Sequence, residues 1–277
     1  MADDVLFEKR PDGVALVTLN RPDSMNAMGG KLMPMLGDYL RQCAWDKEVR
    51  AVVLTGAGRA FCAGGDVKEM GQRRPPSEGG DDGTPRSIIG GLDEAVAGLQ
   101  ESQMRTSYAL HTMPKPTIAM VNGAAVGAGL SLALACDLRI ASDRARLGTA
   151  FRNVGLSGDF GGSFYLQRLV GSGKARELYF TGEIFDAEAA LGLGMVNRIV
   201  PHDQLAEETL AFAAKLAAGP TLTFARMKQN LNLGERGDLK MLLDQEALNQ
   251  RLTGMSNDSR EAVRAFIEKR EAKFTGS

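Results

Sequence analysis

Two glycine-rich segments decide the fold of this chain: GRAFCAGGDVK, from Gly58 to Lys68, and VNGAAVGAGLS, from Val121 to Ser131. Each follows a short apolar run that predicts a buried strand, Ala51–Leu54 or Thr117–Val121. A turn without side chains that opens a helix exposes main-chain N–H groups at the positive end of the helix dipole, where a phosphate or a developing oxyanion can bind. One such turn can be no more than a tight connection, but two that each leave a buried strand can converge on one oxygen atom.

The order of strand, glycine turn and helix repeats and predicts an α/β fold built from ββα units. The elements expected before residue 187 are a hairpin of Val5–Glu8 with Val14–Leu19, helices over Met28–Trp45, Leu92–His111, Gly127–Ala135 and Gly162–Leu169, and a strand over Asp137–Ala141. After that the pattern is nearly all helical: Leu205–Ala217, Thr221–Leu233, Leu239–Leu252 and Asp258–Lys273. We therefore expect residues 1–200 to form the core and residues 201–277 a helical region for subunit contacts and cover of the site. A mobile surface loop is expected from Gln72 to about Pro85.

The composition excludes several classes of protein. Of the 277 residues, 44% are apolar and 24% are charged, which permits a buried core and argues against disorder throughout. No apolar run reaches the roughly 18–20 residues of a membrane span, and the polar start MADDVLFEKR is not typical of a secretory signal. Lysine and arginine number 33 against 34 acidic residues, which argues against a broad surface for nucleic acid. We expect a cytoplasmic protein with neither membrane nor nucleic acid as a partner.

Disulfide and metal chemistry are also disfavoured. Cys43, Cys62 and Cys136 are odd in number, widely spaced and in apolar surroundings, which is typical of reduced cysteines in a cytosolic protein. The chain has only two histidines, His111 and His202, so no His-rich metal centre is expected. Both histidines lie near predicted helix ends and are interpreted as surface or capping residues. Acid–base chemistry is then left to a carboxylate.

Other catalytic signatures fail on inspection. Gly171–Lys174 resembles the end of a P-loop, but Arg168 stands where the earlier glycine belongs and Ala175 replaces the Ser or Thr. Gly155–Gly158 is one residue short of a nucleophile elbow, and no histidine is obviously placed to serve Ser157. A nucleotide-binding protein and a serine hydrolase are therefore weak interpretations.

The two glycine turns belong to a longer series of motifs. In chain order these are Leu19–Pro22 with Met25–Ala27, Ala60–Val67, Lys115–Pro116 with Val121–Gly129, Gly155–Gly162, Thr181–Gly182, Ala187–Val196 and Phe266–Phe274. This series resembles the enoyl-CoA hydratase/isomerase (crotonase) superfamily and covers nearly the whole chain. The resemblance implies a crotonase-like spiral of ββα units with a helical C-terminal trimerisation region, assembled as a homotrimer or a dimer of trimers.

The resemblance also implies a ligand and its site. The ligand would be an acyl-CoA thioester, with coenzyme A as part of the substrate and no separate cofactor. The main-chain N–H groups of Gly65 and Ala128 would form an oxyanion hole. The residues expected along the pantetheine and adenine are Ser24, Met25, Ala63, Asp66, Val67 and Lys68. Lys269, on the same or a neighbouring subunit, would approach the phosphates.

Departures from the family pattern decide the expected reaction. Typical hydratases place two glutamates beside the hole, but the matching positions here are Ser131 and Phe151. Neither side chain can shuttle a proton at neutral pH, whereas addition of water to an enoyl double bond benefits from two carboxylates. We expect Phe151 to line the acyl pocket instead.

One carboxylate remains beside the expected hole, Asp159 in the segment Gly155–Gly162. It resembles the single aspartate of ring-opening isomerases of phenylacetate-type catabolism and of some dienoyl-CoA isomerases. It also resembles the nucleophile of 4-chlorobenzoyl-CoA dehalogenase, but that enzyme needs a histidine after the first motif and residues 67–110 contain none. Burial beside Phe151 and Phe160 should raise the pKa of Asp159 towards that of a useful base. The alternative is that Asp159 only caps the following helix.

We therefore predict an enoyl-CoA isomerase in which Asp159 moves a proton between two carbons and the hole stabilises the enolate. The alternatives are a hydratase in which Asp159 activates water alone, and a catalytically reduced acyl-CoA-binding homologue.

Weaker candidates are Asp66, expected to cap a helix, and Glu69, expected to face solvent. The arginines that could meet CoA phosphates, or be merely solvated, are Arg73, Arg74 and Arg86.

Overall fold

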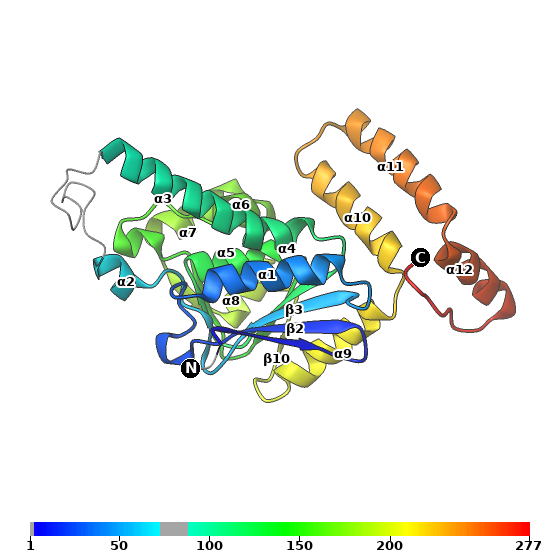
Figure 1. Cartoon of the computed structure of the whole chain (residues 1–277), viewed down its shortest axis with the longest axis horizontal. Helices are drawn as coiled ribbons and strands as arrows, with labels where there is room; N and C mark the ends of the chain where they lie inside the picture. Colours follow the sequence, from blue (N-terminus) through cyan, green and yellow to red (C-terminus); the bar gives the residue numbers. More distant parts are fainter. Residues whose placement is uncertain (1–2, 73–87) are drawn as a thin grey trace.

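The computed structural model describes residues 3–72 and 88–277 (Figure 1). Within them, a larger sheet has six strands in the order β1, β2, β3, β5, β7, β10, and a smaller one has four in the order β4, β6, β8, β9. The bounds are β1 Val5–Lys9, β2 Val14–Leu19, β3 Ala51–Gly56, β4 Ala60–Cys62, β5 Thr117–Val121, β6 Ala124–Val126, β7 Leu138–Ser142, β8 Arg146–Gly148, β9 Ile184–Asp186 and β10 Arg198–Val200. Neighbouring strands run parallel, except for the antiparallel pairs β1–β2 and β8–β9.

Helices follow the strands in the predicted order. Their bounds are α1 Leu32–Trp45, α2 Val67–Gln72, α3 Ile88–Gln103, α4 Ala109–Thr112, α5 Ala128–Ala135, α6 Gly162–Val170, α7 Ser172–Thr181, α8 Ala187–Gly192, α9 Leu205–Ala217, α10 Thr221–Gly234, α11 Leu239–Gly254 and α12 Asn257–Glu268. The prediction of ββα units is confirmed, because β3 and β4 lead into α2, and β5 and β6 lead into α5. Each unit gives one strand to each sheet. The loop expected from Gln72 to Pro85 lies, after Gln72, outside the described residues, as do Arg73, Arg74 and Arg86.

Three predicted helices differ clearly from their expected bounds. The helix predicted over Asp258–Lys273 ends at Glu268, because Lys269 has a left-handed φ of 53°. The other two lie earlier in the chain. The first begins at Leu32 rather than Met28, because Gly30 has a φ of 55° and the Met28 N–H donates to the Gly64 carbonyl instead. The helix predicted over Leu92–His111 is divided, since a π-helical turn, η2 (Met104–Tyr108), lies between α3 and α4. The hydroxyls of Thr106 and Ser107 donate to carbonyls four residues earlier, which competes with the regular helical pattern.

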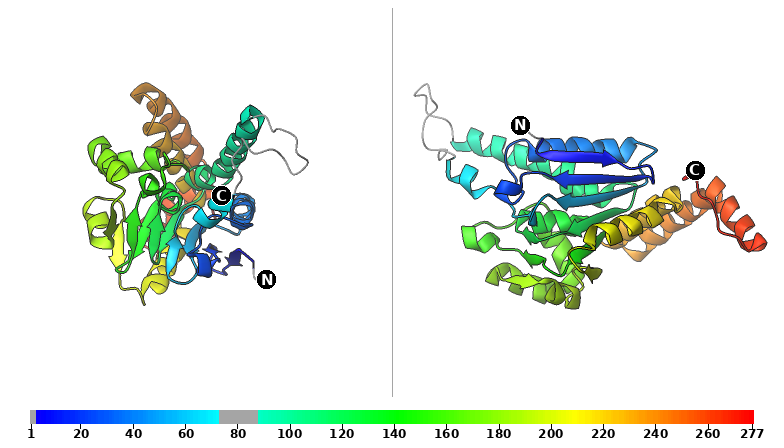
Figure 2. Two further views of the ribbon diagram at one scale, coloured as in Figure 1. Left: turned by 90° about the vertical axis from the view of Figure 1, so that its left-hand side faces the viewer. Right: turned by 90° about the horizontal axis from the view of Figure 1, so that it is seen from below.

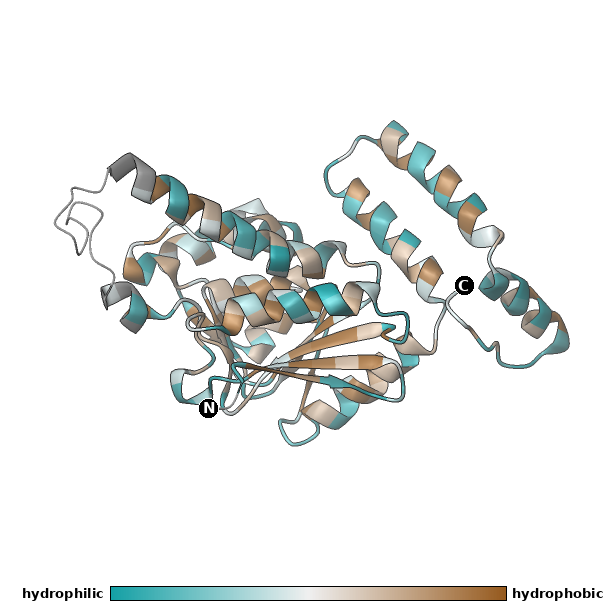
Figure 3. Cartoon of the chain, in the orientation of Figure 1, coloured by the Kyte–Doolittle hydropathy of each residue, from teal (hydrophilic) through white to brown (hydrophobic). Residues whose placement is uncertain are grey.

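Both faces of the larger sheet are covered. Its inner strands are apolar along their length (Figure 3), and all six residues of β3 are buried. On one face, apolar residues of α1 and α5 join the main core. On the other, Leu205, Ala213 and Ala217 of α9 pack against the sheet in a second cluster. A strand covered on both faces reads as a continuous apolar run, which is why Ala51–Leu54 predicts a buried strand.

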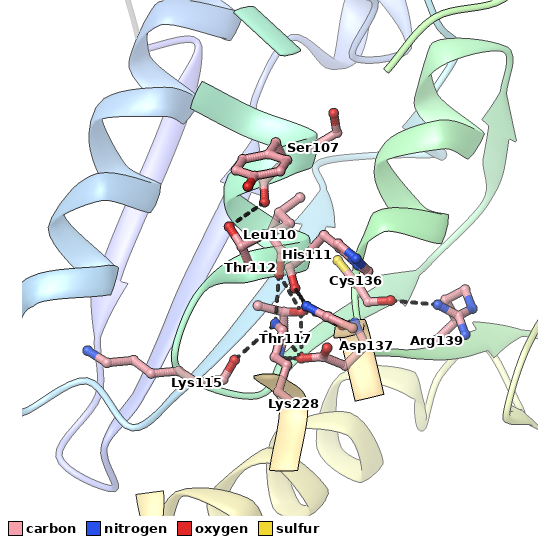
Figure 4. A network of polar contacts seen from close by, with 12 residues as sticks. Ser107, Leu110, His111, Thr112, Lys115, Thr117, Cys136, Asp137, Arg139 and Lys228 are labelled. Atoms are coloured by element: carbon pink, nitrogen blue, oxygen red, sulfur yellow. Dashed lines mark hydrogen bonds and ion pairs between the residues drawn. The ribbon is translucent and has the colours of Figure 1, made fainter. Parts of the chain in front are cut away.

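The last three helices, α10–α12, project from this core and are called the C-terminal arm (Figures 1 and 2). The boundary expected at residue 200 thus falls before α9, a helix that packs on the sheet. Lys228 of α10 anchors the arm: its Nζ donates to the Leu110 carbonyl and to Asp137 Oδ2, each at 2.8 Å (Figure 4). Arg50 holds the start of α10 by donating to Thr221 Oγ1 at 2.9 Å.

Candidate active site

The two glycine turns lie against each other at the ends of β4 and β6, which are adjacent parallel strands. A Cβ atom added to Gly129 would come within 2.1 Å of the Cys62 carbonyl oxygen, and one added to Gly64 within 2.8 Å of the Val126 carbonyl oxygen. Only glycine allows the main chains to approach so closely. The Cβ position of Gly64 is also 3.5 Å from the nitrogen of Ala128. The turns therefore meet where α5 begins.

The amide groups of Gly65 and Ala128 belong to these two turns. Ala128 is the first residue of α5, where the helix dipole is positive and an N–H has no carbonyl partner inside the helix. Neither the Gly65 N–H nor the Ala128 N–H forms a hydrogen bond within residues 3–72 and 88–277. No described residue therefore occupies either donor.

Residues Ser24 and Met25 are folded onto the first glycine turn. The side-chain Nδ2 atom of Asn26 donates to the carbonyls of Ala57 and Ala60 at 2.9 and 2.8 Å. The main-chain N–H of Ala63 donates to the Met25 carbonyl at 3.0 Å. Met25 and Asn26 both have left-handed backbone conformations, which reverses the chain at this point. Ser24, Met25 and Ala63 are thus neighbours.

An ion-pair network joins this loop to α2. Arg21 Nη2 lies 3.3 Å from Asp66 Oδ2 and 3.4 Å from Glu69 Oε1. Asp66 Oδ1 accepts from the Glu69 N–H, which confirms that Asp66 caps α2. The Glu69 side chain is 42% exposed, which agrees with its predicted place on the solvent side of α2. Its Oε1 also accepts from the Gly30 N–H at 3.0 Å.

The remaining residues predicted to contact the ligand divide into two groups. Val67 and Lys68 open α2, directly after Asp66. Lys269 lies at the end of α12 in the C-terminal arm, and the two views agree that α2 and α12 are at opposite ends of the molecule (Figures 1 and 2). The fold of one chain therefore brings together every predicted site residue so far described except Lys269.

Asp159 lies in a tightly turned loop before α6. Gly158, Phe160 and Gly161 all have left-handed φ values, of 104°, 49° and 77°. The Phe160 N–H donates to Gln103 Oε1 at 3.0 Å, which ties the loop to the end of α3. Gly161, not Asp159, is the N-cap of α6, and no side chain caps that helix. The alternative role of Asp159 as a helix cap is therefore wrong.

The wall around Asp159 is largely aromatic. The ring of Phe151 lies 3.7 Å from the Cβ position of Gly127, beside the second glycine turn. Phe151 also stacks on Tyr179 of α7, with ring centroids 6.0 Å apart. Ser131 is almost wholly buried on α5, and its hydroxyl donates weakly to the Gly127 carbonyl at 3.4 Å. The side chains of Phe151 and Ser131 thus line the space between the glycine turn and the Asp159 loop.

This environment changes the acidity of Asp159. Its Oδ1 atom is buried and has no hydrogen-bond partner among the described residues. Burial raises the pKa of the carboxyl to about 6, because the charged form loses hydration without gaining a donor. The predicted direction of the shift is confirmed. A carboxylate with such a pKa can take up and return a proton near neutral pH.

Comparison with known proteins agrees with this geometry. The sequence profile of the Enoyl-CoA hydratase/isomerase family matches residues 9–277. The chain belongs to this family. As a hydratase/isomerase family member it is 37% identical over 264 residues to a 1,2-epoxyphenylacetyl-CoA isomerase of Escherichia coli (strain K12), covering 95% of both chains. It is 34% identical over 272 residues to a short-chain-enoyl-CoA hydratase of Clostridium acetobutylicum, covering 97% of this chain and 96% of that one.

Solved structures of hydratase/isomerase proteins share the fold. An enoyl-CoA hydratase of Mycobacterium smegmatis aligns with a TM-score of 0.86 at 32% identity, over 99% of both chains. An enoyl-CoA hydratase of Bacillus anthracis aligns with a TM-score of 0.87 at 30% identity, over 99% of this chain and 100% of that one. The predicted crotonase-like α/β fold with a helical C-terminal region is confirmed.

Three further observations complete the description of this hydratase/isomerase. Within residues 3–72 and 88–277, no three His, Cys, Asp or Glu side chains cluster as metal ligands do. In the same residues, no helix combines the length and the apolar character needed to cross a bilayer. His111 is half-buried and not at the surface as expected, because it lines a cavity of about 360 Å³ beneath α10 and its Nε2 atom lies 3.6 Å from Glu235 Oε2. Burial there lowers the pKa of His111.

Sequence reasoning missed two residues that surround Asp159 in this hydratase/isomerase. Gln103 and Tyr179 come from α3 and α7, and neither belongs to a glycine turn or to a motif with a defined spacing from Asp159. Arg21 lies in the Leu19–Pro22 motif, but the motif alone predicts no role for it. Its guanidinium joins the Ser24–Met25 loop to Asp66. Only the fold brings these residues to the site.

Proposed function

We propose that the protein is a cytoplasmic enoyl-CoA isomerase that stabilises a thioester enolate. Its reaction would be a 1,3-proton shift, either along a double bond or in a ring-substituted acyl group. The observation that carries the proposal is the buried Oδ1 atom of Asp159, which pairs with no described residue and whose carboxyl has a pKa raised to about 6. Such a carboxylate is ionised at neutral pH yet basic enough to remove a proton next to a thioester carbonyl.

The mechanism uses one base and two main-chain donors. The thioester oxygen accepts hydrogen bonds from the N–H groups of Gly65 and Ala128, which form no hydrogen bond within the described residues. Asp159 removes a proton from one carbon, negative charge moves to the thioester oxygen, and the protonated Asp159 returns the proton two carbons away. One donor of this kind contributes about 3–4 kcal/mol to stabilisation of an oxyanion, so the pair supplies most of the rate enhancement.

The CoA part of the ligand is assigned to the neighbouring loops. In this proposal the pantetheine and adenine run along Ser24, Met25 and Ala63, which the Asn26 and Ala63 hydrogen bonds hold together. The residues that continue this path are Asp66, Val67 and Lys68. Phe151 forms the wall of the acyl pocket beside Gly127.

Hydration of a 2-enoyl-CoA is the alternative activity, and it is favoured by the similarity to a short-chain-enoyl-CoA hydratase. It would require Asp159 to orient water and to handle the α-carbon proton alone, because Ser131 and Phe151 occupy the positions of the two glutamates. The chain is similarly related to a 1,2-epoxyphenylacetyl-CoA isomerase, and this similarity supports the proposed isomerase activity. A catalytically reduced acyl-CoA binder is the third alternative.

An Asp159→Asn variant tests the proposal. We expect turnover of enoyl-CoA isomers to fall about 10²-fold or more, while the dissociation constant for a non-reactive acyl-CoA stays within about twofold, because only the base is removed. Double-bond migration and water addition are measured separately, by chromatography of the CoA esters. Unchanged turnover would remove Asp159 from the mechanism. Hydration alone would favour the hydratase, and no turnover by the native protein would favour the binder.

We also propose that the C-terminal arm mediates assembly into a homotrimer or a dimer of trimers. Large apolar side chains stand exposed along the arm, with exposed fractions of 71% at Leu231, 74% at Met255 and 85% at Phe266. Exposure on this scale is typical of a surface that another chain covers, and a second copy could bring Lys269 towards the CoA phosphates. Light scattering should give about three or six times the 29.6 kDa mass of one chain. A monomer would contradict the proposal.

A further inference from the structure

The cavity beneath α10 lies at the far end of α5 from the second glycine turn. It has a volume of about 360 Å³, at the small end of the range for ligand pockets. Cys136, directly after α5, and Leu138, the first residue of β7, both line it. The glycine turn leads into α5 at Ala128 instead. None of the described lining residues belongs to a glycine turn or to Gly155–Gly162, so the cavity is separate from the candidate active site.

The charged groups of the cavity are unequal in number. Its described walls carry three basic and two acidic side chains, those of Arg139, Arg168, Lys228, Asp137 and Glu235. Lys228 Nζ pairs with Asp137 Oδ2 at 2.8 Å (Figure 4). Arg168 Nε lies 3.9 Å from Glu235 Oε2. Each carboxylate therefore has a basic partner, and the guanidinium of Arg139 is the excess positive charge.

Arg139 is 5% exposed, and the main chain satisfies only part of its guanidinium. Its Nε atom donates to the Met195 carbonyl at 2.6 Å, and its Nη1 atom donates to the Cys136 carbonyl at 2.7 Å. Within residues 3–72 and 88–277, its Nη2 atom forms no hydrogen bond and its guanidinium forms no ion pair. Burial lowers the pKa of Arg139. A buried cation without a carboxylate partner is unfavourable, so a bound anion would stabilise it.

Most of the remaining wall is apolar. Its large apolar side chains include Leu134, Leu138, Leu169, Leu216 and Phe224. A ligand that complements both parts of the wall has an aliphatic chain and a single negative charge. A carboxylate is the anion whose two oxygens match the paired N–H donors of a guanidinium.

We propose that this cavity binds a small aliphatic carboxylate, with its head group on Arg139 and its chain among the leucines. The ligand is a free acid, because a cavity of about 360 Å³ is too small for a whole CoA thioester. The site is distinct from the one assigned to acyl-CoA, and the inference does not depend on the reaction that Asp159 performs.

Three probes of equal chain length test the need for a negative charge. Hexanoate, hexan-1-ol and hexylamine are titrated calorimetrically into the native protein. We expect hexanoate to bind about tenfold or more tightly than either of the others, because only the carboxylate gains a hydrogen bond to a charged group.

A matched pair of variants tests the place of binding. Replacement of Arg139 would also break its bonds to main-chain carbonyls, so the charge is changed at Met227 instead, which lines the cavity and is 52% exposed. Met227→Glu should lower the affinity for hexanoate about five- to tenfold, because it adds a negative charge to the wall. The control is Met241→Glu on α11, where Met241 is 51% exposed and does not line the cavity. It should keep the native affinity within about twofold.

Each other result overturns the inference. Absence of hexanoate binding would do so, as expected if another copy of the chain fills the cavity, and so would equal affinity for the three probes. Native affinity in Met227→Glu would place the acid elsewhere, and equal losses in both variants would show that the effect is not local. None of these results bears on Asp159, whose role is tested by turnover.

Discussion

Asp137 and Asp159 are both partly buried carboxylates, yet their surroundings are opposite. Asp137 Oδ2 accepts from the N–H and the hydroxyl of Thr117, at 2.8 and 2.9 Å, and from Lys228 at 2.8 Å. Asp159 Oδ1 accepts from nothing among the described residues. The carboxylate under the C-terminal arm is satisfied by the protein, whereas the one in the loop before α6 is satisfied by no described residue and acts on the ligand in the proposed function. The contrast predicts that changes at the first site affect stability and changes at the second affect binding and turnover.

The largest effect is expected for Lys228→Met. Its side chain is 9% exposed and pairs with Asp137 across the base of α10, so removal leaves buried acceptors unpaired. We expect the free energy of unfolding to fall by about 3 kcal/mol, measured by urea denaturation. Lys240→Met is the matched control, because Lys240 pairs with Asp244 on the exposed face of α11 and should change stability by less than about 0.5 kcal/mol. Similar losses in both variants would contradict the structural role of Asp137.

A smaller but still clear loss is expected for Gly129→Ala. The added Cβ atom would overlap the Cys62 carbonyl oxygen at 2.1 Å, so α5 must move away from β4. The free energy of unfolding should fall by about 2 kcal/mol. Acyl-CoA turnover should also fall, because the Ala128 amide moves with the helix.

Gly98→Ala is the control for that substitution. Gly98 lies within α3 and a Cβ atom there meets nothing within 4 Å, so the exchange should raise stability by about 0.5–1 kcal/mol through helix propensity alone. A destabilisation in both variants would show that the close approach of the two turns is not the cause.

The pH dependence of stability and of turnover should report on Asp159. Burial raises the pKa of Asp159 above its unfolded value, to about 6, so its contribution to stability is present at low pH and is lost as the pH rises through 6. At pH 7 Asp159→Asn should therefore be more stable than the native protein, by about 1 kcal/mol for a partly exposed group. The difference should vanish near pH 4. Native turnover should rise as Asp159 ionises and level off above pH 6, and a rate that falls over this range would contradict its role as a base.

The smallest effect is expected for Gln103→Leu. Its side chain accepts the Phe160 N–H at 3.0 Å, and loss of this hydrogen bond should lower stability by about 0.5–1 kcal/mol. Turnover should fall several-fold with little change in acyl-CoA affinity, because the Asp159 loop is less well positioned. Gln103→Glu keeps an acceptor and should restore most of the turnover. Equal turnover in both variants would argue against a positioning role.

The fold could be predicted largely from local pattern. Buried parallel strands such as β3 are apolar along their whole length, and the glycines at 64 and 129 mark places where two main chains nearly touch. The divided helix α3–α4 could not be predicted, because a π-helical turn depends on which side-chain hydroxyls compete for carbonyls. The half-buried position of His111 also depends on α10, which joins it from a distant part of the chain.

By itself, the sequence determined the ββα order and the two glycine turns, and it singled out Asp159 as the predicted base, because these depend on residue type and short spacing. The tertiary structure alone decided that no described residue pairs with Asp159 Oδ1, that Gln103 holds its loop and that Tyr179 packs against this loop. The physical reason is that pKa and hydrogen-bond satisfaction depend on what surrounds an atom. Here the surrounding atoms come from α3, α5 and α7, whose positions relative to Asp159 are set by packing and not by distance along the chain.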